Sequence, residues 1–317
     1  MGHMLKSDDL VFVFGALRSG TTVFRLMLDN HPKLANPGEM DFLFDYLAPD
    51  NAAPGGWRYD LEKLQMSRIF RATGLTIDPT AEGLDQLEGF LDQLRAKAQG
   101  QVLMINLHRH VDRLLQVLPG VKIIHMLRDP RDVARSSIAM GWAGTLYHGV
   151  DHWIGTEQDW DMAAPMLTDD QTYTLTYEGL FEDTEGRLKE VCAFAGVPYD
   201  PEMLSYHETS TYAPPDKSLT EQWRRKCEPA HVAELETKAA ALMLARGYTL
   251  SADPSPIPAP RAALLWAQNK LGQWSFGIRR FGLGIYLAEK LTRWTGLKSS
   301  HRRIKLHMDN IVIQNLK

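Results

Sequence analysis

The sequence has little of what several protein classes require. It contains two cysteines, Cys192 and Cys227, and neither lies beside residues that would complete a metal site. So few thiols are typical of a reducing compartment, which favours the cytoplasm. No secretory signal peptide opens the chain, and no run of about 18 apolar residues predicts a transmembrane helix. The net charge of −4 argues against a nucleic-acid-binding protein.

The charge is unevenly distributed along the 317 residues. Residues 261–317 carry eleven Lys and Arg against two acidic residues, so this segment has a net charge of +9 and the rest of the chain −13. A proline-rich linker at residues 252–260 separates the two parts. We therefore expect a main domain over residues 4–251 and a basic, amphipathic helical extension over residues 261–317. Residues 1–3 are interpreted as a remnant of cloning.

Short apolar runs alternate with segments of helical periodicity along the first part of the chain. The predicted strands are Leu10–Phe14, Val102–Ile105, Val121–Leu127 and Tyr173–Tyr177. The predicted helices are Thr22–Asn30, most of Leu61–Lys97 with a break at Asp78-Pro79, Val111–Val117, a helix from about Val133, and Thr184–Ala195. This alternation predicts an α/β fold of three layers, in which helices flank a central, largely parallel sheet as in P-loop proteins.

A glycine loop follows the first predicted strand. It reads Gly15-Ala16-Leu17-Arg18-Ser19-Gly20-Thr21-Thr22 and has P-loop spacing, but threonine stands where a nucleotide P-loop carries lysine. Backbone N–H groups at such a strand-to-helix turn suit a phosphate, and the side chains of Arg18, Ser19, Thr21 and Thr22 can add to the site. A tight turn that binds no ligand is the alternative.

A second motif follows the strand that ends at Leu127. Arg128 has a serine, Ser136, eight residues further along a predicted helix, and together they can hold one phosphate by a guanidinium fork and a hydroxyl. The alternative is a surface ion-pair cluster of Arg128, Asp129, Arg131 and Asp132.

Together the two motifs resemble those of sulfotransferases that use 3′-phosphoadenosine-5′-phosphosulfate (PAPS), in particular bacterial relatives and the tyrosylprotein sulfotransferase branch. The resemblance covers roughly Leu10 to Tyr248. It implies that Arg18, Ser19, Gly20, Thr21 and Thr22 bind the 5′-phosphosulfate. It also implies that Arg128 and Ser136 bind the 3′-phosphate, and that Tyr177 lies near the donor. In the Tyr-Glu-Asp-Leu segment of the family, this sequence has Gly179 in place of aspartate.

A later segment, Ser218 to Lys226, resembles the basic segment of the family. The resemblance implies donor contacts from Ser218, from Trp223 by stacking on adenine, and from Lys226 or Arg224 at the 3′-phosphate. The start of an exposed amphipathic helix is the alternative for each residue.

Glu39, after the turn Asn36-Pro37-Gly38, is the predicted catalytic base, because the resemblance places a Gly-Glu element here. An exposed loop glutamate is the alternative. Relatives often carry a lysine, before the strand of the second motif, that stabilises the leaving group. The corresponding stretch Leu103–His110 has none. Arg109, His108 or His110 is expected to take its place, unless Arg18 suffices.

Two further segments leave alternatives open. The stretch Met140–His148 either walls an acceptor pocket or packs as an ordinary loop. In the extension, helices are predicted at Ala262–Lys270 and Phe276–Trp294. Such basic amphipathic helices make a peripheral contact with a membrane, or else dock on the acidic core or on a second subunit of a homo-oligomer.

The sequence therefore predicts a sulfotransferase that moves a sulfuryl group from PAPS to the hydroxyl of a small molecule, glycan, lipid or peptide. The product would be 3′,5′-adenosine bisphosphate, and no metal or nucleic acid takes part. Two other functions remain open. A P-loop small-molecule kinase would need ATP and magnesium, and a non-enzymatic nucleotide-binding protein would keep the loop without needing Glu39.

Overall fold

The computed structural model describes residues 5–314. The interpretation of residues 1–3 as a cloning remnant lies outside this part of the chain. The described residues form two compact units. Of the described residues, the first unit comprises 5–133 and 152–226, and the second comprises 134–151 and 227–314. The domain boundaries expected at residues 251 and 261 stay a prediction.

A five-stranded parallel sheet forms the centre of the first unit, in the order β2-β5-β1-β6-β7. The strands are β1 (Leu10–Phe14), β2 (Leu34–Ala35), β5 (Val102–Leu107), β6 (Lys122–Leu127) and β7 (Thr172–Thr176). The first strand, β1, lies at the centre of the sheet, and β5 and β6 pair with it on opposite sides. The carboxyl ends of these three strands therefore meet at a switch point in the topology, which is the usual place for a ligand in an open α/β sheet.

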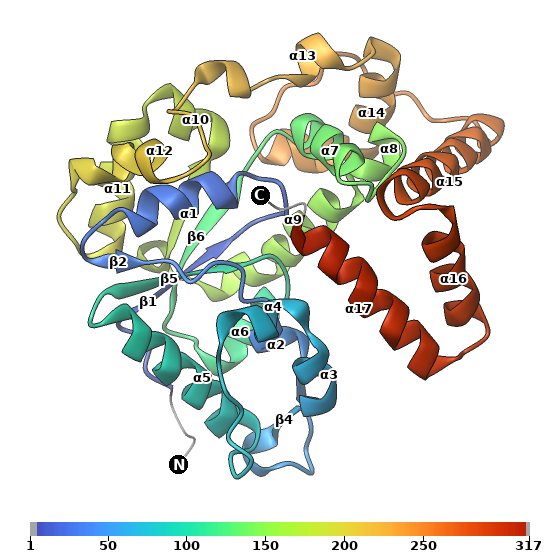
Figure 1. The fold of residues 1–317 in the computed structure, drawn as a ribbon. Coiled ribbons are helices and arrows are strands. Elements are labelled where there is room, and N and C mark those ends of the chain that lie inside the picture. The colour runs from blue at the N-terminus through green and yellow to red at the C-terminus, as the bar shows by residue number, and fades with distance from the viewer. Residues whose placement is uncertain (1–4, 315–317) are drawn as a thin grey trace. The chain divides into compact units, whose positions relative to one another are not determined.

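Helices cover both faces of this sheet (Figure 1). One face carries α1 (Thr21–Asp29), α10 (Tyr177–Glu182), α11 (Thr184–Ala195) and α12 (Tyr206–Thr209). The other carries α2 (Phe42–Asp45), α3 (Leu61–Met66), α4 (Arg68–Thr73), α5 (Gly83–Ala98), α6 (Val111–Val117) and the end of α9 (Asp151–Ala163). A small antiparallel pair, β3 (Leu47–Pro49) and β4 (Trp57–Tyr59), lies beside α5.

The alternation of side chains along β1 explains the two cores. Phe12 and Phe14 pack in the cluster beneath α5, whereas Val11 and Val13 pack in the cluster beneath α1. All five residues of β1 are buried, as expected for a central parallel strand. The three-layer α/β prediction is thus confirmed.

Two boundaries predicted in the first unit need correction. The helix α7 (Pro130–Ala139) begins at Pro130 and not near Val133, because proline is favourable at a first helical position and the Asp129 carboxylate accepts from the Arg131 N–H at 2.9 Å. Tyr177 begins α10 and does not end a strand. The Thr176 hydroxyl accepts from the Gly179 N–H at 3.1 Å and so caps α10.

The second unit is helical. Besides the end of α7 it contains α8 (Leu146–Gly149), α14 (Pro229–Ala245), α15 (Ala259–Phe281), α16 (Leu283–Trp294) and α17 (Lys298–Gln314). The helices predicted at Ala262–Lys270 and Phe276–Trp294 are one continuous helix followed by another. The break lies at Gly282, whose φ of 80° belongs to the region that favours glycine.

Within the described residues, no helix is both long enough and apolar enough to cross a bilayer. The C-terminal helices α15, α16 and α17 follow one another as separate rods (Figure 1). A C-terminal helical extension was predicted, and this part of the prediction is confirmed for residues 261–314.

Candidate active site

The glycine loop joins β1 to α1 at the centre of the sheet. A Cβ on Gly15 would lie 2.1 Å from the carbonyl oxygen of Met126 in β6, so the loop can leave the strand only without a side chain there. Gly20 has a φ of 94° and a Cβ there would lie 2.2 Å from the ring of Tyr177. Arg18 also has a positive φ, 75°, although it is not glycine. Such strain is typical of functional loops.

The loop presents unsatisfied donors at the start of α1. Among residues 5–314, no side chain caps this helix, and its first turn contains no acidic residue. The first N–H groups of a helix have no partner within it, so they favour an anion. Ser19 is buried, and its hydroxyl has no hydrogen-bond partner among the described residues. Thr21 is buried and Thr22 half-buried. This combination fits a phosphate or sulfonate group.

Arg128 lies beside the loop at the end of β6. Its guanidinium donates to the Arg18 carbonyl at 3.1 Å and lies 3.9 Å above the ring of Tyr177, which itself packs against Gly20. The Nε of Arg128 is buried and has no hydrogen-bond partner in the described part of the chain. The structure therefore brings the loop, Arg128 and Tyr177 together.

Ser136 lies in the second unit, and its pairing with Arg128 stays a prediction. Ser218 and Lys226 are exposed. The Ser218 hydroxyl donates to Asp216 at 2.5 Å, and the Lys226 ammonium donates to Gln222 at 2.7 Å. Their donor contacts also stay predictions.

The acidic neighbours of Arg128 form a buried network, so the alternative of a surface ion-pair cluster is wrong. Asp129 accepts from Arg131 at 2.7 Å and from the Trp223 indole at 3.0 Å. Asp132 accepts from the backbone N–H of Trp223 at 2.9 Å. Arg131 lies 3.7 Å above the indole ring, which is buried. Trp223 thus holds its segment against the start of α7, and its ring offers little surface on which an adenine could stack.

The predicted base sits on a turn that is fixed to the end of β5. The backbone of Glu39 forms an isolated parallel bridge with Asn106. The side chain of Asn106 accepts from the Asn36 amide at 2.9 Å, and Asn36 in turn accepts from the Gly38 N–H at 2.8 Å. The Glu39 side chain is 43% exposed. A rigid backbone therefore presents a carboxylate that an incoming molecule can reach.

His108 connects this carboxylate to the glycine loop. Its Nδ1 lies 2.7 Å from the Gly15 carbonyl, so Nδ1 carries a proton, and its Nε2 lies 3.8 Å from Oε1 of Glu39. The imidazole is buried, and Nε2 has no hydrogen-bond partner among the described residues. One ring therefore spans the loop and the predicted base.

The electrostatics of the pair favour opposite charges. His108 is the main cause that lowers the pKa of Glu39, against the effect of burial, and the charges of Arg68 and Arg18 add to it. Burial alone would lower the pKa of His108, but Glu39 and the charge of Asp41 outweigh it and raise that pKa. Glu39 is accordingly an ionised carboxylate in a cationic surrounding.

The other candidates for the missing lysine have partners of their own. Arg109 donates to both carboxylate oxygens of Asp45, at 2.5 and 2.6 Å, and Nε2 of His110 lies 3.2 Å from the same carboxylate. Of the three residues, His108 alone contacts Glu39. Asn106 and Arg68 also act on Glu39 and are not predicted from the sequence. Asn106 carries a signal, because it is a polar residue at the carboxyl end of an otherwise apolar strand.

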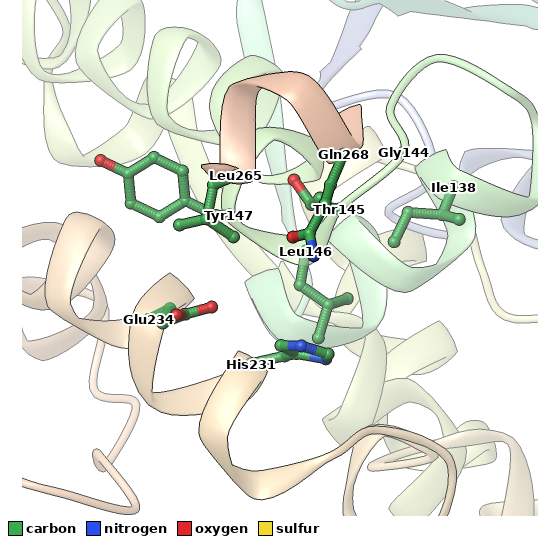
Figure 2. Close-up of a pocket in the computed structure, with 9 residues that line it drawn as sticks. All are labelled: Ile138, Gly144, Thr145, Leu146, Tyr147, His231, Glu234, Leu265 and Gln268. Carbon is green, nitrogen blue, oxygen red and sulfur yellow. The ribbon is translucent and has the colours of Figure 1, made fainter. Parts of the chain in front are cut away.

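Part of the stretch Met140–His148 lines a cavity in the second unit. Gly144, Thr145, Leu146 and Tyr147 face residues of α14 and α15 across a space of about 210 Å³ (Figure 2). Figure 2 shows the Glu234 carboxylate pointing into this space. Its Oε2 is buried and has no hydrogen-bond partner among the described residues. The loop therefore borders a cavity, and its role toward an acceptor stays a prediction.

Comparisons with known proteins agree with the geometry of the first unit. Residues 10–201 match the model of the sulfotransferase family. An uncharacterized protein of Aquifex aeolicus is 26% identical over 227 residues, which cover 66% of this chain and 28% of that protein. A protein of Caenorhabditis briggsae, provisionally named a protein-tyrosine sulfotransferase, is 26% identical over 217 residues, which cover 63% of this chain and 70% of that protein.

Two solved structures share the fold. The sulfotransferase domain of the Synechococcus PCC 7002 olefin synthase has a TM-score of 0.55 at 19% identity, covering 75% of this chain and 98% of that domain. The sulfotransferase domain from the curacin biosynthetic pathway has a TM-score of 0.55 at 18% identity, covering 78% of this chain and 100% of that domain. Because the family match spans more than half of the chain, this protein belongs to the sulfotransferase family.

Proposed function

We propose that this sulfotransferase takes a sulfuryl group from PAPS and transfers it to an acceptor hydroxyl, with Glu39 as the base. One observation carries the proposal. The buried ring of His108 lies between the Gly15 carbonyl of the donor loop and the carboxylate of Glu39. Donor binding and proton acceptance would therefore take place at the carboxyl ends of two neighbouring strands, β1 and β5.

The donor would lie along the loop and Arg128. The free N–H groups at the start of α1 and the unpartnered hydroxyl of Ser19 suit the 5′-phosphosulfate, with Thr21 and Thr22 beside them. The unpartnered Nε of Arg128 suits a 3′-phosphate, to which Ser136, Ser218 and Lys226 would add donors. Tyr177 would support this site because its ring packs against the guanidinium of Arg128 and so fixes its position. Two phosphate positions distinguish this donor from ATP.

PAPS supplies an activated sulfuryl group whose bond to the 5′-phosphate breaks as the acceptor oxygen attacks sulfur from the opposite side. Glu39 takes the proton of the acceptor hydroxyl, so charge balances as the oxygen–sulfur bond forms. The leaving phosphate gains negative charge, and Arg18 with the N–H groups of the loop would stabilise it. No metal is needed for these steps, because the transferred sulfonate carries a single charge.

The surroundings of Glu39 keep its carboxylate in the ionised form that can accept a proton. Its lowered pKa keeps the carboxylate ionised in neutral solution. The exposed carboxylate can meet a hydroxyl, while His108 holds its other side. His108 is a positioning residue in this scheme, since its proton on Nδ1 is engaged by Gly15.

The acceptor is proposed only as a hydroxyl of a small molecule, glycan, lipid or peptide. Tyrosine peptides belong in the test, because of the name of the Caenorhabditis relative. We also propose that the protein acts in the cytoplasm, since a sequence with only two cysteines is typical of a reducing compartment.

Incubation of the protein with PAPS labelled at sulfur, a tyrosine peptide and a cell extract tests the proposal. Labelled product together with an equal amount of 3′,5′-adenosine bisphosphate would support it. A parallel incubation with ATP labelled at the γ-phosphate and magnesium tests the kinase. Phosphoryl transfer in this second incubation, with none from PAPS, would replace the proposed function by the kinase alternative.

A further inference from the structure

Exposed apolar side chains are concentrated in α15–α17 and the loop between α16 and α17. Among the described residues, ten large apolar side chains between Leu264 and Leu306 are exposed. They are Leu264, Trp266, Leu271, Trp274, Leu283, Leu287, Leu291, Trp294, Leu297 and Leu306. Single exposed apolar residues are ordinary, but a contiguous group of them marks an interaction surface.

The clearest group is a stripe on α16. Leu283, Leu287, Leu291 and Trp294 follow at spacings of four, four and three residues, so they share one face of the helix. The three leucines are 55%, 42% and 57% exposed, and Trp294 is 85% exposed. We call these four residues the α16 stripe.

The other side of α16 already has its partner. Tyr286 is buried, and its ring lies where a Cβ on Gly277 of α15 would come within 2.2 Å. The same ring meets Trp274 edge to face, with centroids 6.1 Å apart. These contacts pack α15 against α16, and the α16 stripe takes no part in them.

Helix α15 is divided in the same way. One face packs within the second unit: Leu265 lines the cavity of Figure 2, and Asn269 accepts from the Gly144 N–H at 2.6 Å. On the rest of its surface Leu264, Trp266 and Leu271 are exposed. Lys270 lies 5.9 Å from the Trp266 ring, so a cation accompanies the exposed aromatic side chain.

Charge identifies the kind of partner. Residues 261–317 carry a net charge of +9. On α16, Lys290 and Arg293 lie 3.2 and 3.7 Å from Glu289, so two cations share one carboxylate and the helix keeps a net positive charge. Tryptophan and leucine flanked by Lys and Arg are typical of helices that lie in the interface of an anionic bilayer.

A second copy of the chain fits this surface less well. A twofold dimer would place the same patch against itself and bring like charges together. The cores of dimer interfaces are also depleted of charged residues. We therefore propose that the exposed face of α15 and α16 binds a membrane surface rich in anionic phospholipid, with the α16 stripe inserted among the lipids.

Flotation with vesicles tests this proposal. Vesicles of phosphatidylcholine mixed with an equal amount of phosphatidylserine are compared with vesicles of phosphatidylcholine alone. The full chain is expected to float with the mixed vesicles and to be released by high salt, because salt screens the attraction. Trp294 is expected to contribute a blue shift of tryptophan fluorescence as it enters the lipid. Absence of binding to the mixed vesicles would overturn the proposal.

The variant Leu287→Glu/Leu291→Glu removes two apolar side chains from the stripe and adds two negative charges. A matched control, Met162→Glu/Met166→Glu, makes the same change at exposed methionines of α9 and the turn after it. We expect the stripe variant to lower the partition coefficient at least about tenfold and the control to bind as the unmodified chain does. An equal loss of binding in both variants would mean that net charge alone causes the effect, and it would contradict insertion of the α16 stripe.

Two controls keep the result interpretable. Thermal unfolding followed by circular dichroism must be alike in both variants, and a stripe variant that unfolds early is replaced by the milder Leu287→Ser/Leu291→Ser. Sedimentation measures the oligomeric state without lipid. A dimer that the stripe variant dissociates would overturn the membrane proposal and assign the surface to a second copy.

Discussion

Replacing Glu39 by glutamine removes the proposed proton acceptor and leaves the shape of the site almost unchanged. The turn that holds Glu39 depends on backbone contacts with Asn106, so the substitution does not disturb it. A general base contributes about 10²–10⁴-fold to rate, which corresponds to about 3–5 kcal/mol of activation free energy. We therefore expect turnover to fall by this factor when PAPS and acceptor are saturating.

Donor binding should respond differently from turnover. The Glu39 carboxylate is a negative charge near cations, Arg18 and Arg68, that also attract an anionic donor. Without the carboxylate charge, the attraction of these cations for an anionic donor is no longer offset. The dissociation constant for 3′,5′-adenosine bisphosphate, measured by calorimetry, is thus expected to stay the same or to decrease.

Glu62→Gln is the control for this experiment, because Glu62 is an exposed glutamate on α3. It should leave both turnover and affinity unchanged. Turnover of Glu39→Gln within about threefold of the unmodified enzyme would exclude Glu39 as the base, since a general base contributes far more than that to the rate. Loss of bisphosphate affinity along with turnover would instead make Glu39 part of the donor site.

Three further substitutions test the contacts of His108, Gly20 and Glu178. His108→Asn removes the main cause that lowers the pKa of Glu39. The acid limb of the pH–rate profile should therefore move to higher pH. A limb that does not move would mean that His108 has no influence on the pKa of the base. Gly20→Ala puts a Cβ 2.2 Å from the Tyr177 ring at a residue with a positive φ. Urea denaturation should show a loss of about 1–3 kcal/mol in the free energy of unfolding. An unchanged midpoint would argue against the contact between Gly20 and Tyr177. Burial raises the pKa of Glu178 to about 6, so its contribution to stability is present below its ordinary value of 4.5 and lost as pH rises through about 6. Glu178→Gln should therefore gain up to about 2 kcal/mol over the unmodified chain between about pH 4 and about pH 7, whereas a constant difference would mean that the carboxyl is not perturbed.

Local pattern predicted most of the fold. The apolar run Leu10–Phe14 and the glycine after it define β1 and its loop, because a buried parallel strand needs a continuous apolar sequence. Tyr177 shows where such pattern reasoning fails. The run Tyr173–Tyr177 looks like one strand, but the Thr176 hydroxyl caps a helix that begins at the next residue.

The motifs of the site could be predicted from the sequence, but the side-chain partners of most site residues could not. The loop and Arg128 lie together as their positions after neighbouring strands suggested. The pairing of Arg109 with Asp45, by contrast, joins residues 64 positions apart, and no local pattern contains that information. The same holds for Trp223, whose partner Asp129 is 94 positions away and whose ring is buried.

Whether the protein prefers a nucleotide with phosphates at both ends of its ribose is the sharpest test of PAPS as the donor. The measurement is the thermal unfolding midpoint with 3′,5′-adenosine bisphosphate, ATP, ADP or AMP at equal concentrations. A ligand at a hundred times its dissociation constant stabilises the native state by about 2.7 kcal/mol. The bisphosphate is expected to raise the midpoint by several degrees more than the other three. A larger shift with ATP and none with the bisphosphate would contradict it.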